Sequence, residues 1–352
     1  MNVYSTLEEL NEYRESPAIS QSFLKNILAN KNKEFKETLP MLFGSYLDCL
    51  LTSPSLTEIL YCVGLESRPS EMIKSIIDFL WEEVDGQIDP QMSDIINWQG
   101  RLVEIARGFN YQPRWGDEAI FNAIKKDGEV YWQELANAAG RKMITKKEHD
   151  EAELIRDLVS SSSITAKYFM PSSGIDKYFQ LPLYWNYNDV SCKGLLDLLI
   201  VEHATKTIYY VDIKFTMIET IEQWFRVASD KKYNFQMAWY KEGIESHFEN
   251  LIQQGYKVKM RWMVLSSNTT KFKPWIVPVT ELMLQTGKFG FSYNKEIVVG
   301  KVVTSFEKHI NGFEDAIEKY KFINENGLLD FDINWYQYNG IMPEVDSDKM
   351  FF

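Results

Sequence analysis

The first half of the chain shows a helical pattern of hydrophobic residues. Apolar side chains recur every three or four positions, as they do on one face of an α-helix. The pattern covers residues 19–28, 41–53, 71–84, 94–109 and 146–162. We therefore expect residues 1–165 to form a mainly helical N-terminal region.

From about residue 175 the pattern changes to that of β-strands. Three segments rich in β-branched and aromatic residues are separated by short polar turns, which predicts an antiparallel meander over 177–185, 190–202 and 207–215. Two helices are expected next, at 219–229 and 232–244, the second ending at Gly243 as a helix C-terminus would. Strands return at 257–267 and 272–279, and a last helix over about 304–325 ends before Asn326-Gly327.

This order of elements predicts an α/β fold, with a mixed β-sheet core flanked by helices. We expect the core to span residues 166–330, after the helical half, and residues 331–352 to form a C-terminal tail.

Composition and charge narrow the class of protein. The 352 residues are 45% hydrophobic, so the chain can bury a sizeable core and is not disordered. A net charge of −12 argues against a surface that is basic throughout, but it leaves room for a local basic cleft. No apolar run reaches 18 residues and residues 1–16 contain no signal-peptide core, so we expect a soluble, cytoplasmic protein without membrane association.

The spacing of cysteine and histidine argues against a zinc site or a disulfide framework. Cys49, Cys62 and Cys192 form no CxxC pair, and the four histidines form no HxxxH or HxH pair. Any metal is therefore expected on oxygen ligands.

The segment 193–215 carries the most informative charges. Asp197 and Asp212 each lie inside an apolar run, where an unpartnered charge is costly. If the two strands pair through the turn at 203–206, the two carboxylates meet, and a Mg²⁺ or Mn²⁺ ion between them would relieve their repulsion. Lys214 shares a strand face with Asp212 and could orient water or stabilise transition-state charge. The alternative is that these are solvent-facing residues at strand ends.

A second group of polar residues follows on a predicted helix. Tyr233, Gln236 and Tyr240 share one face of that helix. They could present an amide and a phenol to a phosphate or a base, or they could belong to an ordinary amphipathic helix with core tyrosines. Lys25 and its neighbours Lys31, Lys33 and Lys36 are interpreted as a solvated helix end, with contact to a phosphate as the alternative.

Taken together, these residues resemble the PD-(D/E)XK nuclease superfamily. The likeness rests on Asp197, the Asp212-Ile213-Lys214 triplet and the Gln236-x-x-x-Tyr240 motif, and it favours the RecB-like branch, nearest to RecE-type exonuclease (exodeoxyribonuclease VIII) domains. Scattered landmarks from about residue 19 to 278 match, while 60–165 match no known pattern. The resemblance implies a restriction-endonuclease-like core.

The resemblance also implies roles for individual residues. Asp197, Asp212 and the carbonyl of Ile213 would hold the metal, and Lys214 would act on the attacking water. Gln236 and Tyr240, with Tyr233 on the same face, would contact DNA near the scissile phosphate.

Two positions depart from the family pattern. Asp48 stands where this branch usually carries a metal-binding histidine, and an aspartate there still suits Mg²⁺ or Mn²⁺. Gln180 stands where many relatives carry a glutamate, which puts a second metal in doubt. Three dispersed cysteines cannot hold the iron–sulfur cluster of some relatives, so no such cluster is expected.

The function that follows from the resemblance is that of a Mg²⁺- or Mn²⁺-dependent exonuclease acting on linear duplex DNA in recombination or repair. Such an enzyme would suit a phage or mobile element, with a single-strand annealing protein and a homo-oligomeric ring as candidate partners. Two alternatives stay open: a catalytically decayed, DNA-binding relative, and a structure-specific endonuclease subunit.

Overall fold

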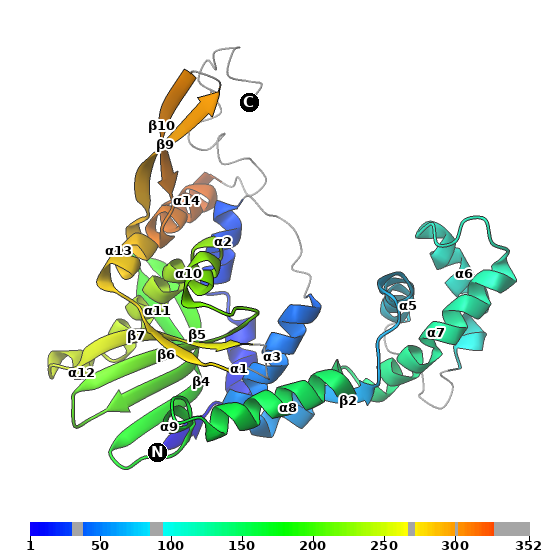
Figure 1. The fold of residues 1–352 in the computed structure, drawn as a ribbon, viewed down its shortest axis with the longest axis horizontal. Helices are drawn as coiled ribbons and strands as arrows, with labels where there is room; N and C mark the ends of the chain where they lie inside the picture. The colour runs from blue at the N-terminus through cyan, green and yellow to red at the C-terminus, as the bar shows by residue number, and fades with distance from the viewer. Residues whose placement is uncertain (30–37, 85–93, 267–271, 300–301, 327–352) are drawn as a thin grey trace. The chain divides into compact units, whose positions relative to one another are not determined.

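The computed structural model describes residues 1–29, 38–84, 94–266, 272–299 and 302–326, with backbone alone at 295–299, 302–306 and 326 (Figure 1). The chain divides into two compact units, Met1–Lys36 with Ser162–Phe352, and Glu37–Ser161. We call the first the sheet unit and the second the helical unit. The expected tail, 331–352, lies outside the described residues.

The sheet unit begins earlier in the chain than the pattern of hydrophobic residues suggested. Residues 2–4 form strand β1 (Asn2–Tyr4), which pairs in parallel with β4 (Ile175–Tyr187). Ile19 then bridges to Cys192, with the Ile19 amide donating to the Ser191 carbonyl at 2.9 Å. Hydrogen bonds to distant strands thus place residues 2–4 and Ile19 with the sheet, a pairing that helical periodicity cannot reveal.

The remaining elements of the sheet unit alternate between helices and strands. They are α1 (Leu7–Glu15), α2 (Gln21–Leu28), α9 (Ala166–Phe169), β5 (Val190–Glu202), β6 (Thr207–Thr216), α10 (Ile221–Asp230), α11 (Tyr233–His247), α12 (Glu249–Gln253), β7 (Lys257–Ser266), β8 (Trp275–Pro278), α13 (Glu281–Phe289), β9 (Phe291–Val299), β10 (Val302–Ile310) and α14 (Phe313–Asn326).

Six strands form one mixed sheet in the order β1-β4-β5-β6-β7-β8. The expected meander is confirmed, because β4, β5 and β6 pair antiparallel in succession. β6 and β7 are parallel, and the crossover between them carries α10, α11 and α12. The predicted α/β class with a mixed sheet flanked by helices is therefore confirmed (Figure 1).

Helix α11 packs against the sheet and continues past the predicted end at Gly243, to His247. A Cβ atom at Gly243 would lie 2.7 Å from the ring of Trp185 on β4. The prediction of a helix end at Gly243 is wrong, because this glycine gives room to a tryptophan instead of ending the helix.

The predicted helix over about 304–325 is also wrong in its first part. Residues Val302–Ile310 form β10, which pairs antiparallel with β9 over its whole length, and α14 begins only at Phe313. Residues 302–310 are a strand because they pair with β9, the strand that directly precedes them in the chain.

The helical unit contains α3 (Leu39–Thr52), α4 (Thr57–Leu60), β2 (Tyr61–Leu65), α5 (Glu71–Glu83), α6 (Gln99–Gly108), α7 (Asp117–Ala138), β3 (Lys142–Thr145) and α8 (Lys146–Ser161), with short 3₁₀ turns at Pro54–Leu56 and Ile95–Trp98.

Its core surrounds the fully buried Trp132 on α7, which Trp81 and Trp98 contact edge-on at centroid distances of 5.3 and 6.4 Å. Helix α7 lies in a stretch for which the hydrophobic pattern predicted no element. None of the helices in the described part of the chain is long and apolar enough to cross a bilayer.

Candidate active site

The candidate site is built around Asp212, a fully buried carboxylate on β6. Its Oδ1 atom accepts hydrogen bonds from Tyr210 Oη at 3.0 Å, Lys214 Nζ at 2.7 Å and Gln236 Nε2 at 3.2 Å. Tyr210 and Lys214 stand two residues to either side of Asp212, so all three share one strand face. Gln236 reaches the same oxygen from α11. The sequence therefore brings three donors to one carboxylate oxygen.

The other carboxylate oxygen of Asp212, Oδ2, is buried and accepts no hydrogen bond from any described residue. A buried ionised oxygen without a partner is costly, and native structures seldom retain one without a reason. A cation bound at Oδ2 would supply the missing interaction.

Asp197 lies beside Asp212, as the sequence predicted. The last ladder pair between β5 and β6 is Leu198 with Val211, and Asp197 and Asp212 are the next residues on the two strands. The Oδ2 atom of Asp197 accepts the backbone N–H of Ile213 at 2.8 Å. This bond fixes the carboxylate next to the Ile213 backbone, whose carbonyl was the third expected ligand.

Lys214 carries its positive charge into this cluster. Burial alone would lower the pKa of its ammonium, but the carboxylates of Asp212 and Asp197 outweigh burial and raise the pKa well above its ordinary value. Lys214 also lies 5.2 Å from the ring centroid of Tyr233. In this arrangement it is a hydrogen-bond donor and a positive charge beside Asp212.

Tyr210 and Tyr240 form the apolar wall behind the carboxylates. Their rings meet edge-on at 5.4 Å, and burial, together with the negative charges nearby, raises both pKa values. A Cβ atom at Gly194 would lie 2.8 Å from the Tyr240 ring, so the glycine makes room for that ring. Both phenols are thus neutral, and only Tyr240 was predicted; Tyr210 could have been found from its i, i+2 relation to Asp212.

The residues expected to contact DNA lie deeper than the sequence suggested. Gln236 and Tyr240 are 9% and 7% exposed, and Gln236 is bonded to Asp212. Tyr233 is half-buried and stacks on Trp224 at a centroid distance of 5.6 Å. The helix brings all three residues to the carboxylates, and contact with DNA stays a prediction for them.

Gln180 lies on β4 opposite Asp197, between the pairs Phe179–Leu198 and Leu181–Leu196. It is 7% exposed and has a φ of 52°, a left-handed conformation that is strained for a residue with a side chain. The strand therefore deforms at Gln180, and a metal-binding role for this position stays a prediction.

Asp48 belongs to α3 of the helical unit, where it is half-buried and its carbonyl accepts the Thr52 hydroxyl at 2.6 Å. Its role as a metal ligand remains a prediction. Within the described ranges, no three His, Cys, Asp or Glu side chains cluster as a ready metal site. The oxygen ligands that the sheet unit offers are the two aspartates and a backbone carbonyl, which suits a Mg²⁺ ion that keeps several waters.

Lys25 is a residue whose place the sequence did not reveal. It lies on α2, which begins after its N-cap Ser20, and its ammonium lies 6.0 Å from the centroid of the Tyr233 ring that Lys214 also contacts. The interpretation of Lys25 as part of a solvated helix end is therefore incomplete. The other three lysines of that group lie outside the described residues.

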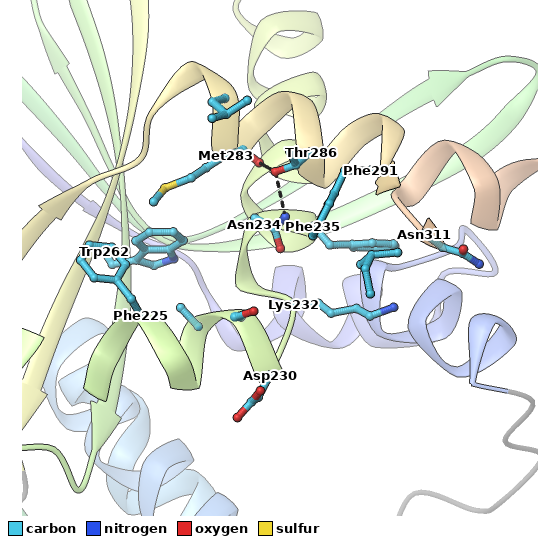
Figure 2. A pocket seen from close by; sticks show the side chains of 14 residues that line it. Phe225, Asp230, Lys232, Asn234, Phe235, Trp262, Met283, Thr286, Phe291 and Asn311 are labelled. Carbon is cyan, nitrogen blue, oxygen red and sulfur yellow. Dashed lines mark hydrogen bonds between the residues drawn. The ribbon is translucent and has the colours of Figure 1, made fainter. Parts of the chain in front are cut away.

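An open pocket of about 680 Å³ lies between α10, α11, α13 and the base of the β9–β10 hairpin (Figure 2). Its walls are mainly apolar, with Phe225, Met283 and Phe291 among them, and Asn234 donates to the Thr286 hydroxyl at 3.2 Å. Asp197, Asp212 and Lys214 are not among its lining residues, so this pocket is distinct from the candidate active site.

Comparison with known proteins gives little support of its own. No family model matches the chain, and no curated protein matches it. A crystal structure of a Eubacterium rectale protein, provisionally described as an exonuclease, is similar at 14% identity with a TM-score of 0.39, over 80% of each chain.

Proposed function

We propose that this chain is a metal-dependent nuclease of the PD-(D/E)XK type, which hydrolyses phosphodiester bonds in linear duplex DNA as RecE-like exonucleases do. The observation that carries the proposal is Asp212. It is a fully buried carboxylate with three donors on one oxygen, no described hydrogen-bond partner on the other, and Asp197 beside it. Such a group is costly to a fold and is retained where chemistry needs it.

The residues present fit a hard divalent cation. Asp212 Oδ2, the Asp197 carboxylate and the Ile213 carbonyl are oxygen ligands of the kind that Mg²⁺ and Mn²⁺ prefer. A bound ion would activate a coordinated water and neutralise charge on the phosphate.

The remaining residues have separate tasks in this proposal. Lys214, protonated because of its two carboxylate neighbours, stabilises the negative charge that develops on the phosphoryl oxygens. Tyr210 and Gln236 hold Asp212 in one orientation through Oδ1, which leaves Oδ2 free for its ligand. The buried ring of Tyr240 packs edge-on against that of Tyr210, which helps to fix the phenol that bonds Asp212.

One observation favours a second candidate, a DNA-binding protein with the same fold and no hydrolysis. Gln180 is a neutral amide at a strained position beside Asp197, where a glutamate would complete a stronger metal site. Loss of that ligand is the change expected in a decayed nuclease.

A time course of DNA cleavage distinguishes these proposals. The purified full-length protein is incubated with linear 5′-phosphorylated duplex, covalently closed circle or single strand, in Mg²⁺, Mn²⁺ or EDTA. We expect metal-dependent loss of linear duplex, absent in Lys214→Ala. Cleavage of the closed circle would point to an endonuclease instead.

Binding of DNA without cleavage in any of these metals would favour the decayed relative. Neither binding nor cleavage of any substrate would contradict both candidates. Circular dichroism of Lys214→Ala shows whether its fold is intact, so that loss of activity can be assigned to the site.

A further inference from the structure

Lys25 places a second positive charge at the candidate site. Its Nζ donates to the Lys231 carbonyl at 3.2 Å and lies 5.6 Å from the centroid of the Phe235 ring. Among the described residues it forms no ion pair with a carboxylate, and Asp212 attracts it only through space. A carbonyl and aromatic rings hold the ammonium in place without neutralising its charge.

The neighbourhood of this ammonium is also electrostatically unfavourable. Burial first, and the positive charge of Lys214 next, lower the pKa of Lys25 to about 8. The carboxylates of Asp212 and Asp197 offset the burial of the Lys214 ammonium. Among the described residues, Lys25 forms no ion pair with a carboxylate that would do the same. Two crowded ammonium groups of which only one is neutralised are a site for an added anion.

The ammonium groups of Lys25 and Lys214 are close enough to bind phosphates of the same DNA strand. Both contact the Tyr233 ring, at 6.0 Å and 5.2 Å from its centroid, so they are at most 6.0 + 5.2 = 11.2 Å apart. Successive phosphates of one strand are separated by more than their rise of ~3.4 Å along the duplex axis, so a span of this size reaches neighbouring phosphates.

We propose that Lys25 is a phosphate-binding residue of this site, and that it contacts a backbone phosphate adjacent to the one that is cleaved. This inference rests on the proposed nuclease function. Lys25 would position the strand, while Lys214 and the carboxylates act on the scissile phosphate. A contact of this kind contributes to affinity and register and leaves the chemical step itself nearly unchanged.

The competing explanation is structural, since Lys25 on α2 also bonds the carbonyl of Lys231 at the end of α10 and contacts the Phe235 ring of α11. The chain offers a matched control for that role. Lys319 on α14 donates to the Ile27 carbonyl at 2.6 Å and so holds the same helix α2 through an equivalent ammonium–carbonyl bond. A lysine with only a structural role should behave alike at both positions.

The experiment compares Lys25→Met, Lys25→Arg and Lys319→Met in the full-length protein. Methionine keeps the apolar stem and removes the charge, so packing against the rings is largely retained. Affinity for a fluorescent linear duplex is measured in EDTA over a range of salt concentrations, and cleavage kinetics are measured in Mg²⁺.

For Lys25→Met we expect the slope of log affinity against log salt to fall by about one unit, and KM to rise about tenfold with kcat within about twofold. Lys25→Arg should restore the slope, and Lys319→Met should leave slope and KM unchanged. Equal behaviour of Lys25→Met and Lys319→Met, with cleavage intact, would overturn the inference and leave the nuclease proposal standing. A wild-type protein that neither binds nor cleaves DNA would overturn both.

Discussion

The two units of the chain bury different kinds of polar group. In the sheet unit the buried polar side chains include two charged residues and two amides, Asp212, Lys177, Gln180 and Gln236. In the described part of the helical unit they are hydroxyls alone, Thr52, Ser53 and Thr145. A charge costs far more free energy to bury than a hydroxyl does. The sheet unit therefore carries a desolvation cost that is absent from the described part of the helical unit.

Charged residues of the helical unit are paired nearer the surface. Arg68 bonds Glu148 at 2.5 Å, and Arg101 pairs with Glu83 and Glu104 on exposed helix faces. Exposed pairs of this kind contribute little to stability. The comparison teaches that the helical unit is held by its tryptophan-centred core. Of the four buried charged or amide side chains described in the sheet unit, three lie at or beside the candidate site: Asp212, Gln180 and Gln236.

The largest expected effect comes from removing the charge at the centre of that site. Asp212→Asn keeps the shape of the side chain, and we expect cleavage to fall about 10³-fold or more because the proposed metal ion loses a charged ligand. Since the substitution leaves the Lys214 ammonium without its ion-pair partner, the free energy of unfolding should fall. Cleavage assays and chemical denaturation check both. A variant that is active but unfolds easily would make Asp212 structural.

Truncation of the helical core should test whether that unit depends on packing alone. Trp132→Ala removes a fully buried ring and should destabilise the helical unit by about 3–5 kcal/mol. Limited proteolysis and thermal unfolding followed by circular dichroism report the change. If the two units fold independently, fragments from within Glu37–Ser161 appear first. Simultaneous cleavage throughout the chain would show that the units unfold together.

Asp48→Ala tests whether the helical unit supplies a metal ligand to the proposed active site. If Asp48 is a metal ligand, the Mg²⁺ concentration needed for half-maximal cleavage should rise by about 10–100-fold. The titration is compared with that of Glu104→Ala, which removes an exposed carboxylate from the same unit. Identical metal dependence in the two variants would confine the metal site to the sheet unit.

Lys177 provides the counterexample within the sheet unit, a buried lysine that serves the fold. It is 1% exposed, and its ammonium donates to the Lys167 carbonyl at 2.5 Å and to the Met170 carbonyl. Lys177→Met leaves these carbonyls unpaired and should lower the free energy of unfolding by about 1–3 kcal/mol. Cleavage at a temperature where the variant is folded should be close to wild type, and a large loss there would link Lys177 to the site.

The smallest effect is expected from a glycine in a helix of the helical unit. Gly44 lies within α3, and no described atom would lie within 4 Å of an added Cβ, so Gly44→Ala should stabilise the protein by about 0.5–1 kcal/mol. Gly243→Ala on α11 is the matched control and should destabilise, because its Cβ would meet Trp185 at 2.7 Å. Denaturation midpoints measure both, and equal shifts would contradict the packing argument.

The sequence by itself determined the class of the fold and the core of the candidate site. Strand periodicity and short turns fixed the β4–β5–β6 meander, and that pairing alone brings Asp197 beside Asp212 and sets Lys214 on the same face. These are local relations, governed by the two-residue period of strands and by hairpin length, and they can be derived from the order of residues.

Tertiary structure decided what depends on distant partners. Residues 1–36 joined the sheet unit through β1 and Ile19, Gly243 became a packing position because of Trp185, and residues 302–310 became a strand because β9 pairs with them. The same holds for Lys25, which reaches the ring of Tyr233 from more than 200 positions away in the chain. Periodicity reports which face a residue lies on, but only the folded chain decides what that face meets.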